Sequence, residues 1–376
     1  MTSSSPASLN PAADPATSRL HSLDALRGFD MFWIMGGDTL ATVLLDRFPS
    51  RSADTLKMQL EHVEWEGFRF YDLIFPLFLF LVGCVIPFSL QKYSSKPAAA
   101  VGRIIRRTLL LIFLGLICNG LLNFEPGQLR WCGVLQRIGV CYGIAALLCL
   151  SLTPRKLTAT IACILLGYWA LLAFVPAPGG TPGDYSKAGN LAGWVDRTVL
   201  PGIILKPYYG DGDNEGILST IPAIATPLIG CLAGIWLRSP RSGLVKTGGL
   251  IISGAALLAV GTAWGNLFPI IKNLWTSSFV LVAAGWSLLL TAGFYFIIDV
   301  IGLRRWAFPF TVIGVNAITI YVAPRFIDFD HLTSFFLSGT ARMSGSWSGV
   351  VAAFGVLFAE WLFLLWLYRS RVFLRL

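Results

Sequence analysis

Charged side chains are scarce in this sequence. Only 13% of its 376 residues are Asp, Glu, Lys or Arg, whereas a soluble domain carries about 25%. Hydrophobic residues make up 55%, the mean hydropathy is +0.68, and the charges cluster between long apolar runs. This composition excludes an ordinary soluble domain and predicts an all-α, polytopic membrane protein. The net charge of +9 is then expected to come from basic cytoplasmic loops. Membrane lipid is the expected partner, and nucleic acid is not.

Several catalytic and metal-binding motifs are also missing. The seven cysteines show neither CxxC nor another metal-ligand spacing, so no metal is predicted and the cysteines are interpreted as packing residues. Neither a P-loop nor a GxSxG motif is present. Residues 1–18 are rich in Ser, Ala and Pro and lack the pattern of a signal peptide. They predict a disordered tail, followed by a single transmembrane domain over residues 19–376.

Long apolar segments are plentiful in the rest of the chain. About ten have the ~20-residue length that a bilayer needs, at residues 29–46, 70–91, 104–122, 132–152, 157–175, 217–237, 247–265, 277–299, 307–326 and 347–368. Basic residues gather in one set of the connections between them, which the positive-inside rule assigns to the cytoplasm. Both termini are therefore predicted to be cytoplasmic, as an even number of spans requires.

Histidine is rare, and one of the three histidines has unusual neighbours. His62 lies just before the second apolar segment, on the predicted outer side, beside Glu61, Glu64 and Glu66. Histidine has an unperturbed pKa suited to proton transfer near neutrality, and neighbouring carboxylates can orient its ring. The alternative is a solvated acidic loop that contains an incidental histidine. His21 and His331 lie elsewhere in the chain.

Ionisable groups within apolar segments are candidates for function, because they are costly in a bilayer unless paired or hydrated. This sequence has a small set of such polar groups: Asp38, Asp72, Arg137, Glu360 and Asn316. Pairing between helices, for instance of Asp38 or Asp72 with Arg137, is the structural alternative. Taken together, these residues favour a polar cavity inside the helix bundle.

Further polar residues are predicted to lie at the outer ends of the segments. They include Trp65, Gln136, Asp211, Asp213, Glu215, Lys272, Asn273 and Trp275. Hydrogen-bonding groups beside a tryptophan suit a sugar, and the carboxylates would also suit a cationic amine. On the inner side, arginines gather at Arg103, Arg106, Arg107, Arg238, Arg304 and Arg305. These are typical positive-inside loops, and they also suit the phosphate groups of a ligand.

Two long motifs make the sequence familiar. RLHSLDALRGFDMFWIMGGD, at residues 19–38, and HVEWEGFRFYDLIFPLFLFLVG, at residues 62–83, resemble the heparan-α-glucosaminide N-acetyltransferase family and its bacterial relatives. The similarity continues through GVLQRIGVCY, NEGILSTIPAIATPLIGCLAG, NLWTSSFVLVAAG and IGVNAITIY. It spans nearly the whole chain after residue 18.

The resemblance implies acetyl transfer across a membrane. Acetyl-CoA would bind from the cytoplasm, and the amino group of a glucosamine-type sugar would be acetylated on the outer side. The family's active-site histidine maps onto His62, which would act as the general base, oriented by Glu61 or Asp72, or as a nucleophile that carries the acetyl group. A large N-terminal luminal domain is not seen, which favours a small amino sugar or an envelope glycan as acceptor.

The resemblance also distributes the other candidates between two substrates. The acceptor is expected to contact Trp65, Gln136, Arg137, Asp213, Glu215, Lys272, Trp275 and Asn316. Acetyl-CoA is expected to contact Asp38, Arg103, Arg106, Arg107, Arg238, Arg304 and Arg305. A homodimer in a bacterial inner membrane is further implied. Two alternatives stay open: an O-acyltransferase of envelope glycans and a transporter of sugars or their derivatives.

Overall fold

The computed structural model describes residues 20–93, 96–204 and 212–374, and these residues are almost entirely helical. Two isolated β-bridges, Glu66 with Ile271 and Arg130 with Gly202, join connections between helices. The all-α prediction is confirmed for this part of the chain. The predicted disordered tail, residues 1–18, lies outside the described residues.

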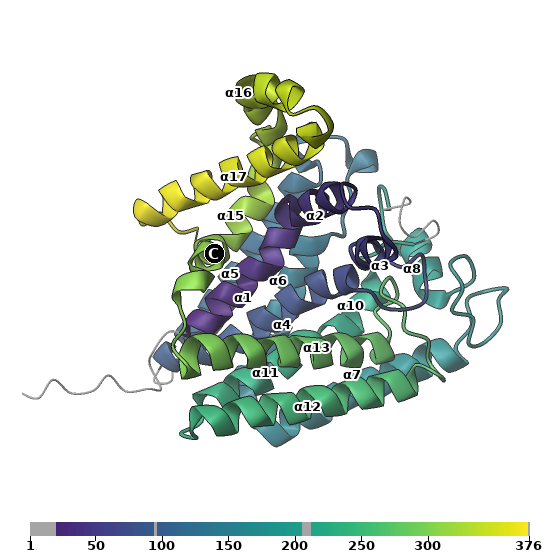
Figure 1. The fold of residues 1–376 in the computed structure, drawn as a ribbon. Helices are drawn as coiled ribbons and strands as arrows, with labels where there is room; N and C mark the ends of the chain where they lie inside the picture. The colour runs from purple at the N-terminus through teal and green to yellow at the C-terminus, as the bar shows by residue number, and fades with distance from the viewer. Residues whose placement is uncertain (1–19, 94–95, 205–211, 375–376) are drawn as a thin grey trace, which may run out of the picture.

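The helices follow one another with short connections (Figure 1). The first half contains α1 (His21–Phe32), η1 (Trp33–Gly37), α2 (Asp38–Leu45), α3 (Arg51–Gln59), α4 (Phe70–Leu90), η2 (Gln91–Tyr93), α5 (Pro97–Cys118), η3 (Leu121–Asn123), η4 (Pro126–Gln128), α6 (Val134–Ser151) and α7 (Pro154–Phe174). The second half contains α8 (Leu191–Val199), α10 (Ile217–Ala223), α11 (Ala225–Arg238), α12 (Gly243–Trp264), α13 (Ser277–Tyr295), η5 (Phe296–Val300), η6 (Arg305–Ala307), α14 (Phe308–Val315), α15 (Ala317–Val322), η7 (Ala323–Arg325), α16 (Phe329–Met343), η8 (Gly345–Trp347) and α17 (Ser348–Arg369).

Seven helical segments of the described chain are long and apolar enough to cross a membrane. They correspond to seven of the ten predicted spans, and the segment predicted at 307–326 becomes an eighth if the bent pair α14–α15 is one span. The other two predictions differ in form. The segment expected at 29–46 begins earlier, at His21, and is broken at Gly36 by a φ of 113°. The segment expected at 104–122 is α5, which includes Arg103, Arg106 and Arg107 in its first three turns.

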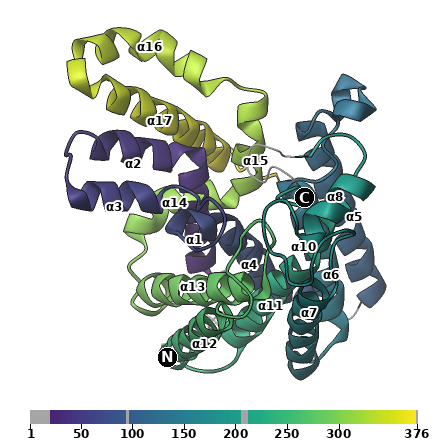
Figure 2. The ribbon, with the colours of Figure 1, turned by 90° about the vertical axis from the view of Figure 1, so that its right-hand side faces the viewer.

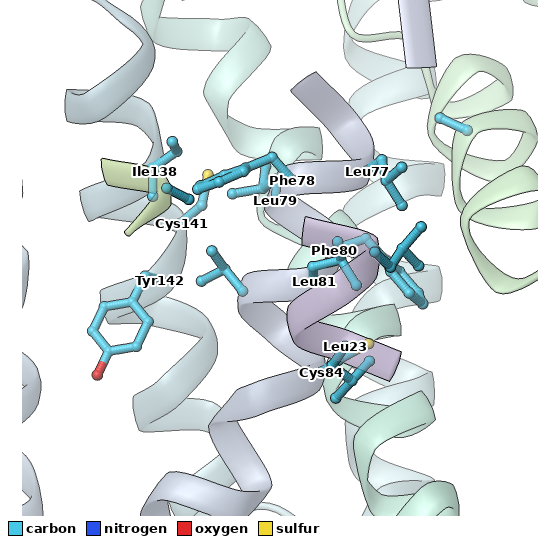
Figure 3. Close-up of a cluster of buried hydrophobic side chains, with 14 of the residues drawn as sticks. Leu23, Leu77, Phe78, Leu79, Phe80, Leu81, Cys84, Ile138, Cys141 and Tyr142 are labelled. Atoms are coloured by element: carbon cyan, nitrogen blue, oxygen red, sulfur yellow. The ribbon is translucent and has the colours of Figure 1, made fainter. Parts of the chain in front are cut away.

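The core of the bundle lies between α1, α4 and α6 (Figure 3). The middle of α4 is buried on nearly all sides, as its continuous apolar sequence predicts. In Figure 3, Phe78 of α4 lies beside Ile138 and Cys141 of α6, and Leu23 of α1 lies beside Cys84. Helix α4 thus forms the centre around which the other helices pack.

Close helix pairs surround this centre. Helix α4 packs on α11, α1 on α14, α5 on α6, and α12 lies along α13 in both views (Figures 1 and 2). Glycine permits the closest of these contacts, since a Cβ at Gly28 would lie 1.7 Å from the carbonyl oxygen of Phe310. A Cβ at Gly314 would likewise lie 1.9 Å from the carbonyl oxygen of Asp24. Small residues at such positions let membrane helices approach and gain dispersion energy.

The bundle has two chemically different ends. Helix α4 begins beside His62 and ends near Arg238, whose guanidinium donates a hydrogen bond of 2.7 Å to the carbonyl oxygen of Pro87. We call these the histidine end and the arginine end. Helices α3 and α8 lie at the histidine end, on the right of Figure 1. At the arginine end, α5 carries Arg103, α11 carries Arg238, and Arg304 follows η5.

Candidate functional site

The site is built on an irregular segment that enters α4. Residues 61–69 form no helix, and the backbone N–H of Gly67 donates a 2.8 Å hydrogen bond to the carbonyl oxygen of Ile270. Gly67 adopts a φ of 125°, which glycine tolerates without steric cost. The bridge between Glu66 and Ile271 continues this pairing. Two segments distant in sequence, 61–69 and 270–276, are therefore held side by side.

Asp72 fixes the position of His62. It occupies the first turn of α4 and is fully buried. Its Oδ2 accepts hydrogen bonds from the backbone N–H groups of Arg69, at 3.1 Å, and Val63, at 3.4 Å. Its Oδ1 lies 2.8 Å from Nδ1 of His62. The helix cap thus leaves one carboxylate oxygen to bind the imidazole, an arrangement that favours a proton on Nδ1 and a basic Nε2.

Lys272 completes a three-residue cluster. Its Nζ lies 2.9 Å from Nδ1 and 3.2 Å from Nε2 of His62, and 3.4 Å from Oδ1 of Asp72. Burial lowers the pKa of Lys272 below its ordinary value, although the carboxylates of Asp72 and Glu215 oppose this shift. A lysine with a lowered pKa can donate or release a proton near neutrality more readily than an exposed lysine.

A cavity of about 440 Å³ opens at this cluster. The polar part of its wall consists of His62, Trp65, Tyr71, Asp72, Asn214, Glu215, Lys272, Asn273 and Tyr321. The apolar part consists of Met31, Ile34, Val63, Ile74, Phe75, Phe78, Val134, Leu135, Ile138, Trp275 and Ile318. Apart from Val63 and Trp275, the apolar residues come from α1, η1, α4, α6 and α15, so the cavity extends from the histidine end into the bundle. A polar mouth above an apolar interior is typical of a small-molecule site.

A second charged cluster supports the mouth of the cavity. Arg130 binds the carboxylate of Asp213 through Nε, at 2.9 Å, and Nη2, at 2.6 Å. Nη2 also donates to Oε2 of Glu215. Asp196 on α8 accepts hydrogen bonds from the backbone N–H groups of Asp213, at 3.2 Å, and Ile217, at 2.9 Å. Burial raises the pKa of Asp196 to about 6, and the two backbone hydrogen bonds oppose that shift.

Trp275 separates the cavity from a buried guanidinium. It is 1% exposed and has a φ of 52°, a value that is rare outside glycine. Phe75 packs edge-on against the indole, and the guanidinium of Arg137 lies 5.0 Å from the ring centroid. Arg137 also donates hydrogen bonds to Oγ of Ser219 and to the carbonyl oxygen of Gly216. The structure thus gives Arg137 these partners instead of the predicted Asp38 or Asp72.

The predicted acceptor residues divide into two groups. Those that line the cavity are Trp65, Glu215, Lys272 and Trp275, together with His62 and Asp72. Gln136, Arg137 and Asp213 are buried behind its wall. Asn316 also lies outside the cavity lining, because it sits at the 61° break between α14 and α15 and donates a 3.4 Å hydrogen bond to the carbonyl oxygen of Val372.

Glu61 differs from its predicted orienting role. Its carboxylate lies 3.7 Å from Nη1 of Arg69, and its side chain is 72% exposed. The contact with the His62 ring belongs to Asp72 instead. Asp72 binds the His62 ring because backbone N–H groups at the start of α4 fix its carboxylate, whereas the Glu61 side chain lies in solvent near Arg69.

The predicted acetyl-CoA residues lie away from the cavity. Asp38 begins α2 and contacts its neighbour Thr39 at 3.5 Å. The arginines gather at the arginine end, where Arg103 donates to Oη of Tyr93 and Arg107 lies 4.4 Å from the ring centroid of Tyr142. The remaining members are Arg106, Arg238, Arg304 and Arg305, and of these Arg106, Arg304 and Arg305 are exposed.

Some residues of the site carry no clear signal in the sequence. Arg130, Asn214, Tyr71 and Tyr321 belong to the cavity wall or its support. The one available signal was the charge of Arg130, a basic residue in a connection assigned to the outer side, against the positive-inside pattern. In the described part of the chain, no group of three or more His, Cys, Asp or Glu side chains is placed to hold a metal ion.

The fold and the site define a polytopic helical membrane protein with a histidine–aspartate–lysine cluster in a cavity at one end of its bundle. Residues 19–179 match the sequence model of the heparan-alpha-glucosaminide N-acetyltransferase family, catalytic region. Residues 19–179 belong to this family.

Two relatives extend the similarity beyond that region. The chain is 30% identical over 322 residues to the heparan-alpha-glucosaminide N-acetyltransferase of Homo sapiens, an alignment that covers 70% of this chain and 48% of the relative. It is 29% identical over 332 residues to the enzyme of the same name from Mus musculus, covering 71% of this chain and 49% of the relative. The chain spans about half the length of these curated relatives.

Proposed function

We propose that the protein transfers the acetyl group of acetyl-CoA to the amino group of a glucosamine-type sugar, with His62 as general base. The observation that carries the proposal is the contact of His62 with Asp72 and Lys272 inside the cavity. The family match and the names of the two relatives support the same reaction.

The chemistry follows from the positions of these side chains. The acceptor nitrogen attacks the thioester carbonyl, a C–N bond forms, and Nε2 of His62 takes the proton from that nitrogen. The C–S bond then breaks, and the proton passes to the thiolate of CoA. Asp72 holds the Nδ1 proton of His62 and stabilises the imidazolium. Lys272, as an ammonium, donates a hydrogen bond to the oxyanion of the tetrahedral adduct. We prefer this direct transfer to an acetyl-histidine intermediate.

The donor would reach the site through the bundle. The cavity reaches two broken helical segments, because its lining includes Ile34 of η1 and Ile318 of α15. Buried polar atoms near these breaks have no hydrogen-bond partner among the described residues: Nε1 of Trp33, Oδ1 of Asn316 and Oγ1 of Thr319. Amide groups of a pantetheine arm would supply such partners in a bilayer. Arginines of the other end would bind the phosphates of CoA.

The central test is removal of the base. We expect His62→Ala to bind CoA and to unfold at the wild-type temperature, while acetyl transfer falls by at least about 10³-fold. Turnover of purified protein with acetyl-CoA and a glucosamine acceptor measures this effect. His21→Ala and His331→Ala are matched controls that should retain activity. Near-normal turnover of His62→Ala would exclude the proposed role.

Sidedness has a separate test. We propose that acetyl-CoA binds from the cytoplasmic side, where the arginine end and both termini would lie, and that the sugar binds from the opposite side. In sealed vesicles, acetyl-CoA should work from the cytoplasmic side only, and a membrane-impermeant glucosamine oligosaccharide from the other side only. Reaction with both substrates on one side would contradict transfer across the membrane. The homodimer and the bacterial inner membrane stay predictions from the family.

A transporter of sugars is the second candidate. The facing breaks at Gly36 and Asn316 favour it, since discontinuous helices frequently surround transporter binding sites. Purified protein discriminates the two functions: an enzyme consumes acetyl-CoA in detergent, whereas a transporter moves the sugar across a vesicle membrane without acetyl-CoA.

A further inference from the structure

We propose that Glu215 binds the amino group of the acceptor as an ammonium ion and thereby selects amines over alcohols. The inference rests on the proposed function, because it assigns a recognition role within the same cavity. The acceptor would arrive with its amine protonated, and Glu215 would reject sugars with a hydroxyl at that position.

The position of Glu215 is fixed from two sides. Its Oε2 accepts a hydrogen bond from Nη2 of Arg130, and its backbone N–H donates a 2.9 Å hydrogen bond to Oδ1 of Asp213. Its side chain is 9% exposed, and what remains exposed lines the cavity. A carboxylate held in this way presents the same atoms to every ligand, because little side-chain freedom is left to lose on binding.

The wall of the cavity offers a free hydrogen-bond acceptor at Glu215. Among the described residues, Oε1 of Glu215 has no hydrogen-bond partner. A free carboxylate oxygen on the wall favours a ligand group that donates a hydrogen bond. An ammonium group carries three donors and a positive charge, whereas a hydroxyl carries one donor and no charge.

The ammonium would lie near the catalytic cluster. Glu215 and Lys272 line the same cavity, and the Glu215 carboxylate is close enough to raise the pKa of Lys272 against the effect of burial. His62 is in contact with Lys272. An amine bound at Glu215 is therefore presented to the side of the cavity where the base lies.

The protons balance as follows. The bound R–NH₃⁺ first gives one proton to Nε2 of His62, which releases it to solvent through the exposed edge of its ring. The resulting R–NH₂ attacks the acetyl carbon, and His62 takes the second proton as the C–N bond forms. The C–S bond breaks, and this second proton passes to the CoA thiolate. The products are the acetamide, CoA–SH and one proton in solution.

The test compares Glu215→Gln with wild type in full-length protein, using acetyl-CoA and glucosamine. We expect the KM for glucosamine to rise about 10- to 100-fold, the range of one charge-assisted hydrogen bond, with kcat and the KM for acetyl-CoA nearly unchanged. The matched control is Glu125→Gln, which removes an exposed carboxylate in the connection that carries Arg130. An unchanged KM for glucosamine in Glu215→Gln would overturn the inference.

The pH profile separates recognition from a structural role. In wild type, the KM for glucosamine should rise as the pH passes the pKa of its amine, since the ammonium is the bound form. In Glu215→Gln this dependence should reverse, because the variant lacks the charge that favours the cation. Equal loss of kcat and of affinity for both substrates, with no change in the pH profile, would assign Glu215 to structure alone.

Two further measurements test the role of Glu215 if Glu215→Gln does not fold or if the wild-type protein shows no acetyl transfer. If Glu215→Gln does not fold, Glu215→Asp replaces it, and a smaller rise in the same KM is expected because the charge is kept and displaced. If wild type shows no turnover, calorimetric binding decides instead. Glucosamine should bind more tightly than glucose to wild type, and Glu215→Gln should abolish that difference; equal binding of the two sugars by wild type contradicts the inference.

Discussion

The two ends of the bundle treat charge in opposite ways. At the histidine end, cations and anions pair directly: Lys272 lies 3.4 Å from Asp72, and Arg130 binds both Asp213 and Glu215. At the arginine end, Arg103, Arg107 and Arg238 have aromatic, hydroxyl or carbonyl partners. Arg107 lies over Tyr142, and Arg238 lies over Phe88 and donates to Pro87.

This difference indicates what each end is suited to bind. Paired charges fix the positions of the side chains around the cavity, because each carboxylate is oriented before any ligand arrives. Cations held by rings and carbonyl groups keep their positive charge for an incoming anion. A neutral or cationic acceptor at one end and a polyphosphate donor at the other are consistent with this division.

The largest change is expected when the histidine end loses its orienting carboxylate. Asp72→Asn should lower kcat by about 10³-fold, since an amide can stabilise the wrong tautomer of His62 and cannot balance the imidazolium charge. Steady-state kinetics measure the effect. Asp54→Asn, which alters an exposed carboxylate on α3, is the control and should leave kcat unchanged. A loss smaller than about tenfold would show that His62 does not need this partner.

Removal of the cluster's cation should have the next largest effect. Lys272→Met should reduce kcat by about 10²-fold, because the oxyanion loses a donor. Since burial lowers the pKa of Lys272, its ammonium is lost at a lower pH than that of an ordinary lysine. Activity should therefore fall on the alkaline side, and Lys272→Arg should move that fall to higher pH. An alkaline limb that is identical in wild type and Lys272→Arg would contradict this role.

Neutralisation at the arginine end should act on only one substrate. Arg107→Gln and Arg238→Gln should each raise the KM for acetyl-CoA about tenfold, the scale of one charge-assisted contact, and leave the KM for the sugar unchanged. Arg342→Gln on α16 serves as the control. Normal affinity for acetyl-CoA in variants of all six candidate arginines would limit these arginines to a role in membrane topology. The arginine end would then not be the binding site for the phosphates of CoA.

The smallest effect concerns stability at the histidine end. Burial raises the folded-state pKa of Asp196 to about 6 from its ordinary value of 3.8, so the folded protein binds a proton between these values that the unfolded chain does not. This contribution stabilises the fold at low pH and is lost as the pH rises through about 6. The Tm difference between wild type and Asp196→Asn should therefore change over this window. A constant difference from pH 4 to pH 7.5 would contradict burial as the cause.

The sequence by itself determined the class of the protein and much of its helical layout. Apolar runs of bilayer length located the seven candidate spans of the described residues and the bent pair α14–α15, because hydrophobic thickness sets the length of such a helix. The sequence failed at helix starts and at a backbone break. It did not show that the first segment begins at His21 and breaks at Gly36, or that α5 begins as early as Pro97. Local hydropathy cannot locate a backbone break or the polar first turns of a helix.

His62, Asp72 and Lys272 show what only the tertiary structure decided. The sequence marked each as a candidate, and for His62 it left Glu61 and Asp72 as equal partners. The choice of Asp72 depends on its position in the first turn of α4, where backbone N–H groups orient its carboxylate. Lys272 reaches His62 across 210 residues of chain because the bridge at Ile271 holds the two segments together. The sequence shows which side chains could take part in proton transfer or charge stabilisation. The contact between distant segments decides which of these side chains lie together.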